Sequence, residues 1–84
     1  MIHRIESIRN YLEKQGYEIG SRETMLGISI VEGKIETGRG TLEVAWGTNG
    51  TARVIKPNGT VKWLYEKSFP QIARALEQTI WYNR

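Results

Sequence analysis

The side chains that most often carry out acid–base or nucleophilic chemistry are scarce in this sequence. It has no cysteine and no aspartate, and His3 is its only histidine. General acid–base catalysis needs titratable groups held close together, and metal binding needs a cluster of ligands. The glutamates are scattered, without a spacing typical of either chemistry. We therefore predict a protein that is not an enzyme and has no cofactor or metal, with His3 as a solvated residue of an N-terminal helix.

Aromatic and basic side chains could instead form a binding surface. The stretch TLEVAWGTNGTARVIKPNGTVKWLY, residues 41–65, holds Trp46 and Trp63 with Arg53 between them. Tryptophan, tyrosine and arginine are the commonest hot-spot residues of protein interfaces. Aromatic rings beside Lys and Arg also form platforms on which nucleic-acid bases stack. A structural interpretation competes with both, because the two indoles could lie at the margin of the core with Arg53 extending to water.

Length and composition indicate one small globular domain, residues 1–84. Apolar residues make up 39% and charged residues 25%, as in folded rather than disordered proteins. No apolar run approaches the roughly 20 residues of a membrane span, and the charged N-terminus does not resemble a signal peptide. We therefore expect a cytoplasmic protein with no membrane partner. The net charge is +3, and its excess falls mostly within residues 25–67, which serves solubility or attracts an acidic partner or nucleic acid.

Two segments have the periodicity of amphipathic helices. The first predicted helix spans residues 2–15. The second begins after Ser68, which forms a capping-box pattern with Gln71 three residues later. The apolar faces of the two helices consist of Ile2, Ile5, Ile8 and Leu12, and of Phe69, Ile72, Ala73, Leu76 and Ile80.

Between the helices the apolar period changes to two, which is typical of strands. Residues 18–24 are polar and are predicted to be a connection. Strands are predicted at residues 26–31, 34–37, 41–47, 51–56 and 60–66, with turns at 32–33, 38–40, 48–50 and 57–59. The predicted fold class is α+β: a small two-layer domain, with an antiparallel meander of four to five strands flanked in sequence by an N-terminal and a C-terminal helix. Both helices are expected to pack on one sheet face.

The turns determine which side chains share a face of the sheet. At Pro57 we predict a type I turn followed by a left-handed glycine, because proline has no N–H to bond across a two-residue turn. This turn pairs Arg53 with Trp63. A two-residue Asn-Gly turn in the preceding hairpin would pair Trp46 with Arg53. Together these choices place Trp46, Arg53 and Trp63 on one face, with Arg53 between the two indoles, a geometry that allows cation–π contact.

The predicted function is binding to another protein, as an adaptor, modulator or inhibitor of a larger partner, with a homodimer as one form. Trp81 and Tyr82 follow a helix whose apolar face is already complete, so they join Trp46 and Trp63 as predicted protein-binding residues. The alternative is nucleic-acid binding through a basic, aromatic sheet surface. The residues predicted for this alternative are Lys34, Arg39, Arg53, Lys56, Lys62 and Tyr65.

Overall fold

The computed structural model describes residues 3–83 of the chain, without the side chains of residues 21–25. The chain forms an N-terminal helix, then a five-stranded antiparallel sheet and then a C-terminal helix, so the predicted α+β architecture is confirmed. The elements are α1 (Ile5–Lys14), β1 (Glu18–Met25), β2 (Ile28–Thr37), β3 (Gly40–Gly47), β4 (Ala52–Ile55), β5 (Val61–Leu64) and α2 (Phe69–Tyr82).

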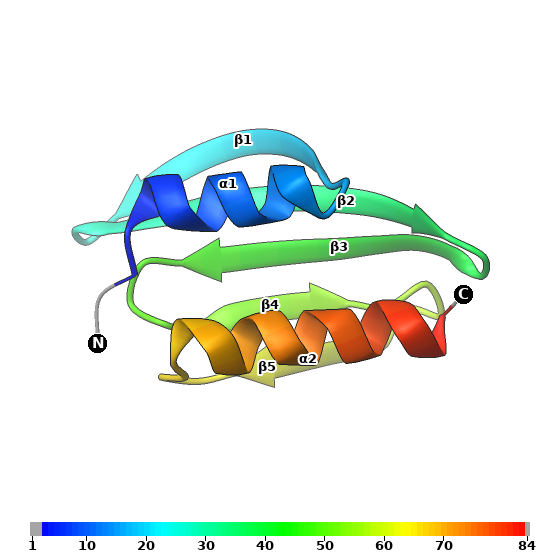
Figure 1. Ribbon diagram of the computed structural model, residues 1–84. Helices are drawn as coiled ribbons and strands as arrows, with labels where there is room; N and C mark the ends of the chain where they lie inside the picture. The colour runs from blue at the N-terminus through cyan, green and yellow to red at the C-terminus, as the bar shows by residue number, and fades with distance from the viewer. Residues whose placement is uncertain (1–2, 84) are drawn as a thin grey trace.

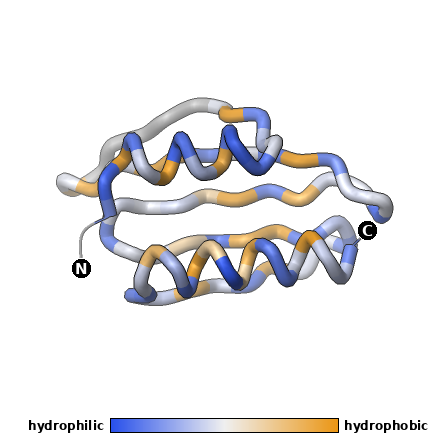
Figure 2. Tube along the Cα trace, viewed as in Figure 1, coloured by the Kyte–Doolittle hydropathy of each residue, from blue (hydrophilic) through white to orange (hydrophobic). Residues whose placement is uncertain are grey.

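The strands follow one another across the sheet in the order of the sequence, with β1 and β5 at the edges. Figure 1 shows α1 alongside β1 and β2, and α2 alongside β4 and β5. Both helices lie on the same face of the sheet, and apolar and polar residues alternate along each of them (Figure 2). The domain therefore has two layers, and neither helix of the described chain covers the opposite face of the sheet.

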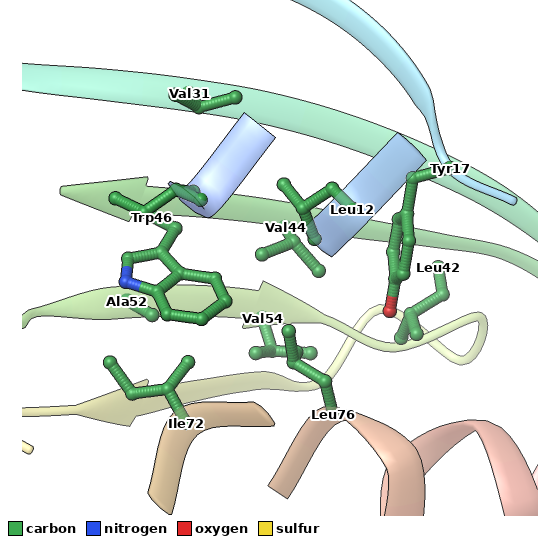
Figure 3. Close-up of a cluster of buried hydrophobic side chains, with 11 residues drawn as sticks. Leu12, Tyr17, Val31, Leu42, Val44, Trp46, Ala52, Val54, Ile72 and Leu76 are labelled. Atoms are coloured by element: carbon green, nitrogen blue, oxygen red, sulfur yellow. The ribbon is translucent and has the colours of Figure 1, made fainter. Parts of the chain in front are cut away.

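The core lies between the two helices and the sheet (Figure 3). Trp46 on β3 is its largest fully buried side chain. Each helix contributes two fully buried aliphatic residues, and burial of one such side chain stabilises a fold by about 1.5–3 kcal/mol. Ser68 caps α2, since its Oγ accepts the Gln71 N–H at 3.3 Å and its N–H donates to Gln71 Oε1 at 2.9 Å. The helical residues of the core are Ile8, Leu12, Ile72 and Leu76.

The first two strands differ from the prediction. The segment predicted to be a connection is the edge strand β1, and the turn predicted at residues 32–33 lies inside the continuous strand β2. The chain turns instead at Leu26 and Gly27, whose φ angles of 53° and 78° are those of a two-residue hairpin turn. Gly33 serves packing rather than turning, because a Cβ there would lie 3.3 Å from the Tyr17 Cβ.

The register between β3 and β4 also differs from the prediction. Trp46 pairs with Ala52, whereas the two-residue turn would have paired it with Arg53. Both Asn-Gly turns have the same geometry: the Gly47 N–H donates to the Thr51 carbonyl, as the Lys56 N–H donates to the Thr60 carbonyl, each at 2.9 Å. In an antiparallel pair one residue of shift moves a side chain to the other face.

That single shift separates the predicted trio of side chains. Arg53 still pairs with Trp63, as predicted, but both side chains lie on the face opposite to Trp46. The predicted stacking of Arg53 between the two indoles is therefore wrong. Trp46 belongs to the helix-covered face, and Trp63 belongs to the face without helices.

Candidate protein-binding surface

Trp46 is inaccessible to a partner. Its side chain is 0% exposed, and its indole N–H donates to Nδ1 of His3 at 3.0 Å. The Phe69 ring packs against it at a centroid distance of 4.7 Å. Trp46 is thus a core residue, and its predicted role in protein binding is wrong.

His3 also differs from its predicted solvated position. Only 5% of the residue is exposed, and its backbone N–H donates to the Thr48 carbonyl at 2.7 Å. The bond from the indole requires that Nδ1 carries no proton. His3 thus ties the start of the chain to the turn that follows β3. The sequence gives no sign of this burial, because His3 is a polar residue that precedes the first turn of α1.

The face of the sheet without helices is the principal candidate for a binding surface, and we call it the open face. Its side chains alternate along each strand with those of the core. The apolar ones come from strands β2 to β5 and from the turn between β1 and β2. The described residues of the open face include Glu18, Leu26, Ile28, Ile30, Glu32, Lys34, Glu43, Ala45, Arg53, Ile55, Val61 and Trp63, together with Gly20 and Gly47.

A trough runs along β3 on the open face. The trough forms there because Ala45 has a small side chain and Gly47 has none. At one end, a hollow of about 280 Å³ is lined mostly by apolar residues, including Ile28, Ile30 and Trp63. At the other end, a hollow of about 300 Å³ is lined by charged and apolar residues in similar measure. A ligand on this surface would therefore meet an apolar half and a half of mixed polarity.

The β5 side of the trough is aromatic and strongly exposed. Trp63 is 50% exposed and Tyr65 is 62% exposed. Their rings stack with centroids 5.8 Å apart and an interplanar angle of 11°. Val61 is 47% exposed on the same strand. Large apolar side chains that are gathered on one face of a small domain mark an interaction site.

Charges of both signs lie across the open face. The Lys34 ammonium is 3.6 Å from Glu43 Oε1, in an exposed ion pair of small energetic value. Glu18 and Glu32 add two more carboxylates, and Arg53 adds one guanidinium. Among the residues that the structure describes, neither Glu32 nor Arg53 takes part in an ion pair.

Trp81 and Tyr82 lie away from the open face, at the end of α2 in the helix layer. They are 59% and 69% exposed, and their rings meet edge to face at a centroid distance of 5.1 Å. The four residues predicted for protein binding thus occupy three places: the core, the open face and the end of α2. Only Trp63 lies beside a hollow rich in apolar residues.

The residues predicted for nucleic-acid binding are also divided. Lys34 and Arg53 lie on the open face among carboxylates, and Tyr65 stacks on Trp63. The remaining three lie near the last turn of α2. Lys56 and Lys62 line a depression of about 230 Å³ together with Tyr82, and the Arg39 N–H donates to the Asn83 carbonyl at 3.2 Å.

Two tyrosines outside the open face have raised pKa values. The Tyr11 hydroxyl donates a hydrogen bond to the Glu77 carboxylate at 3.1 Å. Burial and this carboxylate together raise the pKa of Tyr11 to about 12. Burial also raises the pKa of Tyr17. Both phenols therefore stay protonated near neutral pH and serve packing. In the described part of the chain, no three potential ligands from His, Cys, Asp and Glu come together as a metal site, and no helix is long and apolar enough to cross a membrane.

Comparisons with family models, with curated proteins and with solved structures returned no match for this chain.

Proposed function

We propose that this protein is a small non-enzymatic protein-interaction module that binds its partner through the open face. The observation that carries the proposal is the half-exposed Trp63 beside the apolar hollow over β3. Indole rings at such positions supply a large contact area with few rotatable bonds, which makes them frequent hot spots. The helices already cover the other face, so the open face is the broad surface that remains for a partner.

The charges of the open face favour a protein partner over nucleic acid. Among the side chains that the structure describes, phosphate groups at this hollow would meet Glu18, Glu32 and Glu43 as well as Lys34 and Arg53. Nucleic-acid affinity comes largely from neutralising phosphates with Lys and Arg, and carboxylates oppose it. A protein interface, in contrast, accommodates charges of both signs around an apolar centre.

Photo-crosslinking from the open face tests the proposal directly. A photoreactive amino acid at Val61, which is half exposed beside Trp63, is expected to form adducts with protein in extracts of the native host. The same group at Tyr82 is the matched control, since that exposed position lies in the helix layer. Trp63→Ala is expected to abolish the adducts from position 61, because loss of a hot spot weakens binding by roughly 30-fold or more. Adducts from position 82 alone would contradict the proposal.

Oligonucleotide binding separates the proposal from its alternative. We expect no saturable binding of labelled single- or double-stranded oligonucleotides to micromolar protein, even at low salt, as measured by fluorescence anisotropy. Non-specific binding through a basic surface is strongest at low salt and falls steeply as salt rises. Binding with that salt dependence, lost on Lys56→Ala with Lys62→Ala, would instead favour a nucleic-acid site beside the end of α2.

A further inference from the structure

One row of side chains crosses the whole open face at the level of Ala45. From β2 to β5, the strand register pairs Glu32 with Ala45, Ala45 with Arg53, and Arg53 with Trp63. The row continues to Gly20 on β1, where a Cβ would lie 4.0 Å from the Glu32 Cβ. The order across the sheet is thus glycine, carboxylate, alanine, guanidinium and indole.

This row is complementary to itself about its centre. We infer that the open face binds a second copy of this chain, with a twofold axis that runs parallel to the strands over Ala45. The inference rests on the proposed function and names the partner. In this arrangement β2 of one protomer faces β4 of its partner, and β1 faces β5. The indole of Trp63 then meets the gap left by Gly20, and the two alanines meet at the axis.

The same axis pairs Glu32 with Arg53, and neither side chain has an ion-pair partner within a described protomer. Neighbouring strands are about 4.8 Å apart, so Glu32 on β2 and Arg53 on β4 stand roughly 10 Å from each other within one sheet. Two packed sheets also lie about 10 Å apart, a gap that a glutamate and an arginine can bridge from opposite sides. The twofold axis would form this ion pair twice.

The size of the face matches what a stable dimer needs. The domain extends 35 × 21 × 21 Å. A face with sides of 35 and 21 Å has an area of about 700 Å², close to the roughly 800 Å² that each partner buries in a standard interface. A chain of 84 residues buries a small share of its surface, so a second apolar layer would also add stability. The next row along the strands opposes the dimer. There Glu43 lies near the axis and would approach its symmetry mate, although Lys34 partly balances its charge. Glu18 and Lys34 of that row would face Val61 and Ile55 of the partner.

Charge reversal tests the inference by sedimentation velocity and multi-angle light scattering. We expect the unmodified chain to be a dimer at micromolar concentrations. Arg53→Glu alone and Glu32→Arg alone are expected to weaken the dimer by roughly 100-fold or more, since each places like charges opposite one another twice. An equimolar mixture of the two variants is expected to dimerise again, because every contact in the mixed pair joins opposite charges. Trp81→Ala is the control and is expected to leave the dimer intact.

Each other result overturns the inference. If the chain remains monomeric far above micromolar concentration, the open face serves another protein, and crosslinks from position 61 to that protein would preserve the proposed function. If Arg53→Glu and Glu32→Arg both still dimerise, the copies meet elsewhere. If neither variant dimerises and the mixture does not recover, the two residues do not face each other. Circular dichroism spectra and melting temperatures confirm that each variant is folded.

Discussion

Trp46→Ala is expected to destabilise the protein by about 4 kcal/mol, within the range for truncation of a buried tryptophan. The indole is fully buried, contacts the rings of Tyr11 and Phe69, and donates its N–H to Nδ1 of His3. Removal leaves a cavity at the centre of the core and an unpaired imidazole nitrogen. A domain of this length has a total stability of about 4–13 kcal/mol, so the substitution should remove about a third or more of it.

Trp63→Ala is the matched control for this experiment. The same residue type is removed from the other face of the sheet, where it is half exposed in the protomer, so a loss of about 1 kcal/mol or less is expected at protein concentrations at which the chain is monomeric. Urea denaturation followed by circular dichroism measures both variants without relying on the fluorescence of the replaced residue. Similar losses for the two variants would mean that both indoles share one environment, as the register predicted from the sequence required, and would contradict the observed register.

The second large effect is expected at a glycine of the first Asn-Gly turn. Gly50 and Gly59 hold the same position in two turns of the same geometry, with φ angles of 86° and 87°. Alanine at either position carries the cost of a left-handed conformation, about 1–2 kcal/mol. At Gly50 a Cβ would also lie 2.9 Å from the Lys67 carbonyl oxygen, whereas at Gly59 it meets nothing within 4 Å.

We therefore expect Gly50→Ala to cost roughly 3 kcal/mol or more and Gly59→Ala about 1–2 kcal/mol, because only the first must also displace backbone. The Lys67 N–H donates to the Gly50 carbonyl at 3.0 Å, so this displacement would disturb the approach of the chain to α2. Thermal and urea unfolding of the two variants measure the difference. Equal losses would show that the close approach of residue 67 to the turn does not constrain the fold.

Local sequence was sufficient for the elements whose signals do not depend on distant residues. The periodicity of apolar residues identified both helices, and Ser68 with Gln71 identified the start of α2. Proline chemistry at position 57 gave the correct turn and the correct pairing of Arg53 with Trp63. The order of elements and the two-layer architecture followed from these patterns, because an amphipathic helix and a sheet must bury their apolar faces together.

Tertiary structure decided the candidate binding surface. Strand β1 is polar because it lies at an edge of the sheet, so its sequence does not alternate as a half-buried strand does. Gly33 resembles a turn residue, yet it is required because Tyr17 and Leu12 pack against its backbone. An Asn-Gly pair is compatible with turns of more than one length, and only packing of Trp46 against the helices selects the longer one. With a side-chain period of two, that choice of one residue determined that Trp46 became core and that Trp63 and Arg53 lie on the open face.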